Sequence, residues 1–512
     1  MSKSVEKSRS NSSENKIVTK QSSGEYSDIR SNDKSEEIKQ LLPTSDDNEI
    51  NKSLKKRWVA LGLFGALACS QCCIWNTWGP IATSAMTAYP TWHKSSLALI
   101  SNWGCITYLT CCLPCCWFLK QFNLSTALKV AATLTTIATF IRCVSSLGII
   151  LTTTAHLAAI LNGLSGVIVG PATAAVSAIW FPIGERTTAT GISSACGQLG
   201  VAMSYLLGPA LVGNNPSHHL NVKAKNNNHW KTLDQHSNDI APKSIEISGN
   251  NSNNLLTSDQ ILLRIQITSL MRIEFVIQFI VMLGILWFFP RQSEFSTSNF
   301  KMSTINFNKS LKNLIRNKSM WLLCLAAAFC QGMTGPWLVM ITMAFGSTVT
   351  QDEADKLAFW TVIFSSILSL CATRIMDSFQ GHLKLAIYML LLTSTMMFLW
   401  IVLLDWRVLT FHKDELYAAV IIGIATSWST PALFFELASE IAFPVSEAIV
   451  GGYLIFLSNI IGTTFYLSYI IPGMGGRLST CLVFGNLIIA TILIAYVKDD
   501  YNRTKHENEL NQ

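Results

Sequence analysis

The sequence predicts an all-α, polytopic membrane protein with twelve transmembrane helices in two six-helix bundles. Half of the residues are hydrophobic and only 13% are charged, well below the roughly 25% that is usual for a soluble domain. The charged residues are concentrated between apolar runs, and about 20 consecutive apolar residues suffice to span a bilayer. Two groups of six such runs occur, at about 58–83, 97–119, 126–149, 154–180, 188–212 and 265–289, and at about 319–346, 357–378, 384–404, 416–442, 447–471 and 477–497.

The hydrophilic segments around these runs predict the domain organisation. The N-terminal segment is rich in Ser, Asn, Lys and Glu and has too little apolar surface to offset the entropy of folding. The long loop inside the first group is rich in Asn and low in complexity, so we expect it to be disordered as well. The predicted parts are a disordered tail at 1–54, a first bundle at 55–289 with the loop at 213–264, a basic linker at 290–318, a second bundle at 319–497 and a tail at 498–512.

Basic residues predict which side of the membrane each segment faces. Lys55–Arg57 precedes the first run, Lys498 follows the last, and the linker between the groups carries further Lys and Arg residues. The positive-inside rule therefore places both termini and the linker in the cytosol and the loop at 213–264 in the lumen. The sequon of that loop, at Asn250, is then a predicted N-glycosylation site. The formal net charge of +7 is attributed to cytosolic loops, and nothing in the sequence indicates a nucleic-acid partner.

The N-terminal tail contains a candidate sorting signal. Its segment Glu37-Ile-Lys-Gln-Leu41-Leu42 fits the acidic dileucine pattern that sorting adaptors bind as an extended cytosolic peptide. The pattern is short and frequent by chance, but here it lies in a flexible tail shortly before the first membrane helix. We therefore predict that Glu37, Leu41 and Leu42 bind sorting adaptors.

A polar interruption in the first apolar run recurs in the second bundle. Residues 71–80 read Gln-Cys-Cys-Ile-Trp-Asn-Thr-Trp-Gly-Pro, and residues 331–337 read Gln-Gly-Met-Thr-Gly-Pro-Trp. Interrupted hydrophobic segments at matching positions of two halves indicate the binding site of a transporter, although Gly and Pro are also commoner in membrane helices than in soluble ones. The side chains that we expect to contact a solute are Trp75, Asn76, Trp78, Gln331 and Trp337.

Ionisable residues within the apolar runs are candidates for function because a charge in lipid is costly. Glu436 and Glu440 stand four residues apart and therefore share one face of the tenth predicted helix. We expect this pair to couple transport to protons, with Glu436 deeper in the membrane and Glu440 nearer the cytosol. Arg142 in the third run is a candidate for an ion pair with a carboxylate that fixes helix packing.

Two cytosolic loops place opposite charges beside turn residues. The first loop reads Phe-Pro-Ile-Gly-Glu-Arg over residues 181–186, and the second extends over residues 374–384. The residues that we expect to form charge clamps between helices are Arg142, Glu185, Arg186, Arg374 and Asp377.

Several of these motifs carry a family resemblance. The pattern Arg-x-x-Asp-x-x-x-Gly-x-x-Lys from Arg374 to Lys384, with two bundles of six and a basic linker, resembles the major facilitator superfamily. The matching loop of the first half, Lys120–Asn123, lacks the usual Asp-Arg. Further segments are similar to solute carrier family 49, which holds the choline and heme-associated feline leukaemia virus receptor-related transporters. These segments are Trp75–Ile81, Trp180–Gly191 and Phe435–Glu447.

The resemblance implies a secondary transporter of small organic solutes in lysosomal membranes, with pyridoxine (vitamin B6) as the solute of one lysosomal member. The aromatic faces of Trp75, Trp78 and Trp337 suit a planar pyridine ring, but they also suit a cation. A choline, ethanolamine or heme-related exporter is therefore an alternative function. The plasma membrane is an alternative location. A transporter-like receptor or scaffold that recruits partners through its tail is another.

The expected partners are the solute, protons, the lipid bilayer and sorting adaptors. No catalytic constellation is visible in the sequence, so we expect no enzymatic activity, no cofactor and no metal site.

Overall fold

The computed structural model describes residues 46–213, 257–290, 307–345, 349–379, 381–468, 476–498 and 501–510. The chain divides into two units, Met1–Lys55 and Lys56–Gln512, and every contact given below joins residues of the second unit. Glu37, Leu41, Leu42 and Asn250 lie outside the described residues. Their roles in sorting and glycosylation therefore stay predictions.

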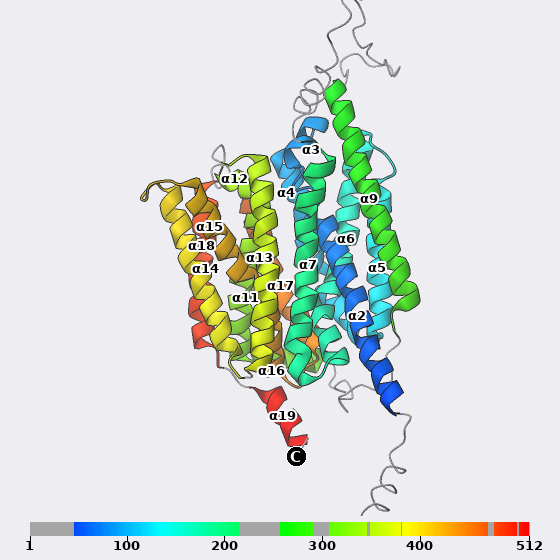
Figure 1. The fold of residues 1–512 in the computed structure, drawn as a ribbon, viewed down its shortest axis with the longest axis vertical. Coiled ribbons are helices and arrows are strands. Elements are labelled where there is room, and N and C mark those ends of the chain that lie inside the picture. The colour runs from blue at the N-terminus through cyan, green and yellow to red at the C-terminus, as the bar shows by residue number, and fades with distance from the viewer. Residues whose placement is uncertain are drawn as a thin grey trace, which may run out of the picture. The chain divides into compact units, whose positions relative to one another are not determined.

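Long helices make up the described chain before residue 290, which we call the first half (Figure 1). Within it α6 packs against both α4 and α5, and α9 packs against α5 and α3. The helices are α2 (Asp46–Trp75), α3 (Ala82–Ala88), α4 (Lys94–Gln121), α5 (Leu124–Arg142), α6 (Gly148–Trp180), α7 (Ile183–Leu211) and α9 (Ser258–Phe288).

The second half has the same character and follows a short helix, α10 (Phe307–Arg316). In this half α11 packs against α17 and α18, and α14 packs against α15 and α18. The helices are α11 (Lys318–Val339), α12 (Ile341–Phe345), α13 (Gln351–Ser378), α14 (Leu383–Asp405), α15 (Lys413–Trp428), α16 (Pro431–Ala442), α17 (Glu447–Ser468) and α18 (Arg477–Tyr496). A terminal helix, α19 (Asn502–Leu510), follows them.

The predicted all-α, polytopic membrane fold is confirmed. Eleven segments of the described chain are helices long and apolar enough to cross a membrane. The twelfth long helix, α7, has 29 residues but is rich in Gly, Ser and Thr, so it is not among the eleven. It packs along α13 of the second half, where small residues let two helix backbones approach closely.

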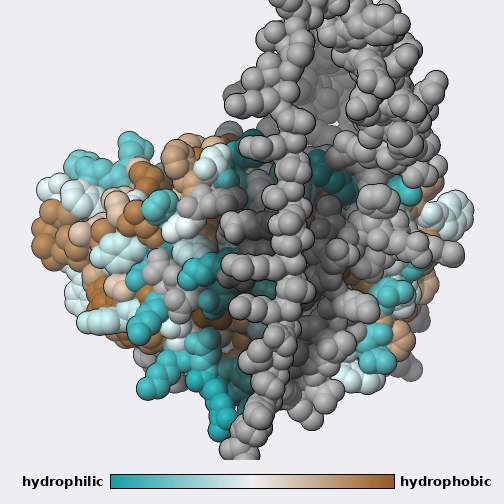
Figure 2. All heavy atoms as spheres, turned by 90° about the horizontal axis from the view of Figure 1, so that it is seen from below, coloured by the Kyte–Doolittle hydropathy of each residue, from teal (hydrophilic) through white to brown (hydrophobic). Residues whose placement is uncertain are grey.

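Apolar side chains cover the flanks of the bundle as well as its core. On α14 and α18 the side chains of Leu385, Met389, Trp400 and Ile492 are exposed. Figure 2 shows hydrophobic residues gathered on this flank, at the left of the view. In a chain with helices long enough to cross a bilayer, such a flank faces lipid.

Three of the predicted spans contain breaks that hydropathy does not show. After α2 ends at Trp75 the chain turns before α3, so the run predicted at about 58–83 is not one helix. In the second half, α11 continues through Pro336 and ends three residues later at Val339. The tenth span is split into α15 and α16, and Pro431 opens α16 because a proline is accommodated in the first turn of a helix.

Glycines let the two halves approach along two seams, α7 with α13 and α4 with α17. A side chain at Gly191 of α7 would collide with Thr373 of α13. A side chain at Gly452 of α17 would collide with the Cys116 thiol of α4. The cysteines follow the same logic, since all fourteen are free and seven of them are buried as small packing residues.

Candidate functional site

The interrupted segments of the two halves meet at one end of the bundle. Gly79 follows the end of α2, and a Cβ atom added there would lie 3.5 Å from Cγ1 of Val339, the last residue of α11. Figure 1 shows the short helices α3 and α12, which follow the two interruptions, at this same end. The repeat detected in the sequence therefore corresponds to a contact between the halves.

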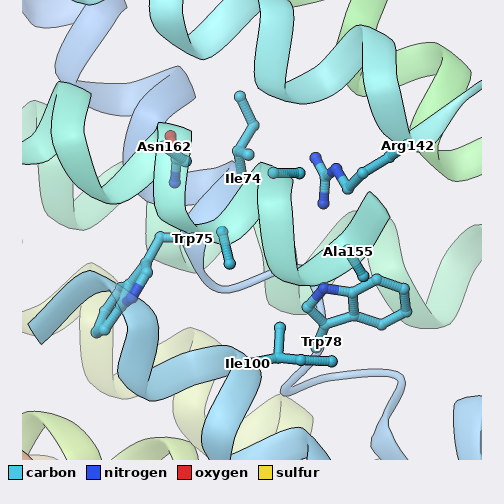
Figure 3. Close-up of a pocket in the computed structure, with 9 residues that line it drawn as sticks. Ile74, Trp75, Trp78, Ile100, Arg142, Ala155 and Asn162 are labelled. Atoms are coloured by element: carbon cyan, nitrogen blue, oxygen red, sulfur yellow. The ribbon is translucent and has the colours of Figure 1, made fainter. Parts of the chain in front are cut away.

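A small cavity lies beside the first interruption, within the first half. Trp75, Trp78, Arg142 and Asn162 are among the residues that line it (Figure 3). Its volume is about 20 Å³, which is room for roughly one water molecule. Two of the lining polar atoms, Nε of Arg142 and Oδ1 of Asn162, are buried and have no hydrogen-bond partner among the described residues.

The two tryptophans of the cavity are held in fixed orientations. The Trp75 indole Nε1 donates to the Ser101 carbonyl at 3.3 Å. The Trp78 ring packs edge-on against Trp92, with ring centroids 5.0 Å apart. Figure 3 shows Trp78 beside Ile100 and Ala155, with the guanidinium of Arg142 nearby. The site therefore presents aromatic rings next to an unpartnered donor and an unpartnered acceptor.

A buried ion pair borders this cavity. Nη2 of Arg142 on α5 donates to Oε2 of Glu274 on α9 at 2.7 Å, and both side chains are 3% exposed. The Thr77 hydroxyl donates to the other carboxylate oxygen of Glu274, also at 2.7 Å. Removal of one partner would leave an uncompensated buried charge. The pair therefore fixes α5, α9 and the end of α2 relative to one another.

The remaining predicted solute-contacting residues lie elsewhere. Asn76 donates to the Ser204 hydroxyl of α7 at 2.8 Å. Trp337 is completely buried in the core of the second half, where it packs edge-on against Phe398 and donates to Thr480 at 3.4 Å. The structure thus does not bring Trp337 to the cavity that Trp78 lines. Gln331 is half-buried, and its Nε2 has no partner among the described residues.

At the opposite end of the bundle, Asp377 of the second half caps a helix of the first. Its two carboxylate oxygens accept from the backbone N–H groups of Thr187 and Thr188, at 3.2 and 2.7 Å. These groups lie near the N-terminus of α7, where the helix dipole and free N–H groups favour an anion. The cap is a direct polar link between α13 and α7.

The other predicted clamp residues make different contacts. Glu185 pairs with Arg57 at 3.1 Å, within the first half. Arg186 is buried, and its Nε donates to the Phe181 carbonyl at 3.2 Å. Arg374 is exposed. Asp377 is thus a predicted clamp residue with recorded hydrogen bonds to the opposite half.

The predicted coupling pair sits in a second link at this end. Glu436 and Glu440 on α16 are both buried. Arg503 of α19 donates to Glu436 at 2.8 Å and to Glu440 at 3.2 Å. Oε1 of Glu436 also lies 2.9 Å from the Thr190 hydroxyl of α7, which donates to it across the two halves.

Charge in this cluster is only partly balanced. Besides the two buried carboxylates, Glu447 lies 3.8 Å from the Arg503 guanidinium. Burial disfavours the charged form of Arg503, but the three carboxylates outweigh it and raise the pKa of the guanidinium above its ordinary value. Thr504 adds neutral donors, since its backbone N–H and its hydroxyl bind Glu440 at 3.1 and 2.8 Å.

Sequence reasoning missed several partners in these sites. The sequence does not identify Arg503, Thr77 or Thr190 as site residues. One signal was present, because two carboxylates on one face of a membrane helix require a cation nearby. No local pattern identifies this cation as Arg503.

Comparison with known proteins agrees with this architecture. No family model matches the chain. It is 29% identical over 456 residues to the solute carrier family 49 member 4 homolog of Xenopus laevis, covering 88% of this chain and 92% of that one. It is 23% identical over 169 residues to the choline/ethanolamine transporter FLVCR2 of Homo sapiens, covering 33% of this chain and 32% of that one.

Solved structures of transporters share the fold. The major facilitator superfamily transporter FucP, in its outward conformation, aligns with a TM-score of 0.58 at 14% identity, covering 85% of this chain and 98% of that one. The full-length sequence similarity and this shared fold agree with the motifs at residues 75–81, 180–191, 374–384 and 435–447. Over most of its length the chain is similar to members of solute carrier family 49, and it shares the fold of a solved major facilitator superfamily transporter.

Proposed function

We propose that this membrane transporter exports pyridoxine from lysosomes, and that protons drive its net transport. The observation that supports a small, planar, polar solute best is the cavity beside the first interruption. It combines the rings of Trp75 and Trp78 with the unpartnered Nε of Arg142 and the unpartnered Oδ1 of Asn162. Small-molecule sites have this composition, mostly apolar walls with a few convergent polar groups.

The chemistry of pyridoxine matches these groups. Its aromatic ring can stack on an indole, and its hydroxyl groups can donate to Asn162 and accept from Arg142. A buried polar atom without a partner costs free energy until a ligand supplies one. Because the cavity holds only about one water, as its 20 Å³ volume shows, solute binding requires the surrounding helices to move apart. Such movement is the alternating access of transporters of this kind.

Proton coupling is assigned to Glu436, with Glu440 as its neighbour in the same cluster. In this state Glu436 accepts hydrogen bonds from both Arg503 and Thr190. Protonation would cancel its charge and weaken both contacts. A proton on Glu436 would therefore loosen the link between α7 and α16, which connects proton binding to opening at this end. The basic linker and flanking residues support a cytosolic location for this end.

Choline or ethanolamine transport is the second candidate. It is favoured by the similarity to the choline/ethanolamine transporter FLVCR2 and by the affinity of indole faces for ammonium groups. The guanidinium of Arg142 beside the cavity disfavours a cation there, although its charge is balanced by Glu274. A heme-related exporter and a scaffold that does not transport are the remaining alternatives.

A transport assay separates these candidates. Replacement of Leu41 and Leu42 by alanine should disable sorting and bring the protein to the cell surface, where uptake of labelled pyridoxine, choline and ethanolamine can be compared at acidic and neutral external pH. We expect pyridoxine uptake that rises at acidic pH and falls in Asn162→Leu. The matched control is Asn459→Leu, because the hydrogen bond that the Asn459 amide donates is to the Ile455 carbonyl of its own helix, α17.

Each other outcome points to a different conclusion. Preferential uptake of choline or ethanolamine would replace the proposed substrate. An absence of uptake of every solute by protein at the surface would favour the scaffold, and that function would depend on the N-terminal tail. Protein that stays in lysosomes after the Leu41 and Leu42 substitutions would refute the sorting role of the dileucine.

A further inference from the structure

An apolar pocket opens at the seam between the two halves, apart from the proposed solute site. Its volume is about 170 Å³. The walls come from α4 of the first half and from α17 and α10 of the second, and the lining residues are Cys112, Leu113, Cys116, Ile315, Ile449, Tyr453 and Phe456. Leu113 and Ile315 are 52% and 49% exposed, so they form its mouth.

The pocket lies close to one end of the membrane-spanning helices. Its α17 residues fall within the first ten residues of that helix, which begins at Glu447, or about 15 Å at 1.5 Å per residue. Cys116 likewise lies near the end of α4 at Gln121. An occupant can therefore reach both the hydrocarbon layer and the polar surface of a bilayer.

One of the lining residues has a polar atom without a partner in the described chain. The hydroxyl of Tyr453 is buried and makes no hydrogen bond among the described residues. Its ring packs edge-on against Trp321, with centroids 5.7 Å apart, and the Trp321 indole donates to the Ile315 carbonyl at 2.8 Å. A buried hydroxyl of this kind indicates an acceptor in the occupant, because buried polar groups are normally hydrogen-bonded.

Basic residues flank Ile315, a residue of the pocket mouth, in the sequence. Lys312 and Arg316 stand four residues apart on α10 and so share one face, and Lys318 begins α11. All three are exposed. Leu314, between them in sequence, is 1% exposed and belongs to the core of the second half. A helix with one buried apolar face and one basic face lies in the interface of a membrane and attracts anionic lipids.

We infer that α10 and the adjoining pocket bind an anionic phospholipid. One acyl chain occupies the pocket, an ester carbonyl accepts from the Tyr453 hydroxyl, and the phosphate lies against Lys312 and Arg316. The apolar lining excludes a hydrophilic solute, and the basic rim favours an anionic headgroup over a zwitterionic one. The site is independent of the proposed transport substrate.

The lipid would act on a part of the protein that changes during transport. Cys112 and Cys116 of α4 contact the backbone of α17 at Gly452 and Ala448, with Sγ to oxygen distances of 3.4 and 4.0 Å. An acyl chain bound beside these contacts would fill the space between α4 and α17 in the conformation that the structure shows. Lipid composition would then shift the balance between conformations.

Trp321 provides a direct reporter of occupancy. The full-length protein is reconstituted in phosphatidylcholine vesicles that contain a minor fraction of phosphatidylserine with brominated acyl chains, which quench nearby tryptophans. The difference in quenching between the parent and Trp321→Phe isolates the signal of Trp321. We expect brominated phosphatidylserine to quench it at much lower mole fraction than brominated phosphatidylcholine.

Variants assign this preference to the site. Lys312→Gln should lower the apparent affinity for phosphatidylserine about 5-fold, and Lys312→Gln with Arg316→Gln roughly 25-fold. The charge-matched control is Lys498→Gln with Lys505→Gln, two exposed residues that are not part of α10. This control should leave the apparent affinity for phosphatidylserine unchanged. Leu113→Phe, which narrows the mouth without a change in charge, should reduce quenching.

Three results would overturn the inference. Equal quenching of Trp321 by the two brominated lipids would remove the anionic preference. Quenching that is the same in the parent and in Trp321→Phe would place the lipid elsewhere. If the α10 double variant and the control double variant lose the same amount of apparent affinity for phosphatidylserine, only the overall charge of the protein attracts the lipid.

Discussion

The Thr190 hydroxyl donates a 2.9 Å hydrogen bond to the Glu436 carboxylate and so joins α7 of the first half to α16 of the second. Both residues are buried. The bond lies at the same end of the bundle as the Asp377 cap on α7. The two links hold the halves together there, and one of them depends on the charge of a carboxylate.

Loss of the Thr190 hydroxyl should favour opening at this end. Thr190→Val keeps the volume but removes a hydrogen bond to a charged group, worth about 1.5–3 kcal/mol, which shifts the open-to-closed ratio by roughly 10-fold to 100-fold. Labelling of buried Cys116 by a membrane-impermeant maleimide, applied from the α19 side, should become faster. Thr188→Val is the control, since the Thr188 hydroxyl has no partner among the described residues. Equal labelling of the two variants would contradict the role of Thr190.

Removal of Arg503 should destabilise the protein strongly. Arg503→Gln leaves the buried carboxylates of Glu436 and Glu440 without their cation, and a broken buried ion pair costs about 3–5 kcal/mol. Thermal unfolding in detergent should show a large drop in Tm at neutral pH and a smaller drop at acidic pH, where the carboxylates can take up protons. Arg503→Lys keeps the charge but loses the planar set of guanidinium donors. Its Tm at neutral pH should lie between those of the parent and Arg503→Gln. A Tm that does not depend on pH in Arg503→Gln would refute this account.

Trp78 and Trp337 should behave differently although both were predicted to contact solute. Trp78→Leu removes an aromatic face at the cavity, worth about 0.5–2 kcal/mol, so KM should rise roughly 2-fold to 30-fold. Because Trp78 is itself buried against Trp92, Tm should fall as well. Trp337→Leu opens a hole in the fully buried core of the second half and should mainly lower Tm. Uptake kinetics and thermal unfolding of both variants check this. A rise in KM for Trp337→Leu at normal stability would restore it to the solute site.

Glu436→Gln should uncouple transport from protons. The amide oxygen can still accept from Arg503 and the amide NH2 can donate to the Thr190 hydroxyl, but the side chain cannot titrate. Net uptake should lose its dependence on the imposed proton gradient while exchange of labelled for unlabelled solute persists. If uptake still rises with the gradient as in the parent, the coupling group is Glu440, Glu274 or another ion.

Asn250 tests the proposed membrane orientation. If the loop at 213–264 is lumenal, Asn250→Gln should remove a glycan and increase gel mobility, as should enzymatic deglycosylation of the parent. Protein whose mobility is the same before and after deglycosylation carries no glycan at this site. Protease protection of the loop in sealed vesicles would then show whether the orientation itself is reversed.

Hydropathy was sufficient to predict the fold because most of the spans are continuous apolar segments. The run predicted at about 154–180, for example, corresponds to α6 at Gly148–Trp180. Breaks inside apolar runs were invisible to the same signal. Hydropathy alone does not reveal the split before Pro431, and it does not reveal the turn after Trp75.

The sites were predicted less completely because their partners are far apart in sequence. The Glu436 and Glu440 pair was recognised from local spacing, whereas Arg503 is 67 residues from Glu436 and Thr190 is 246 residues from it. Trp337 is the opposite case, because local sequence predicted a contact with solute and the structure places the residue in the core. Its sequence setting resembles that of Trp78, but its side chain points into the core of one half.

The position of Arg503 near the C-terminus has a consequence for biogenesis. It is synthesised 63 residues after Glu440, a delay of roughly 3 to 13 s at about 5–20 residues per second. During that interval α16 carries two carboxylates without their counter-ion, and a charge at the centre of a membrane helix costs about 2.5–3.5 kcal/mol to insert. The tenth span should therefore settle into place only after translation of α19. A nonsense mutation a few codons before Arg503 would leave all the described spans encoded but this last step unfinished, and the nascent chain would be a substrate for membrane quality control.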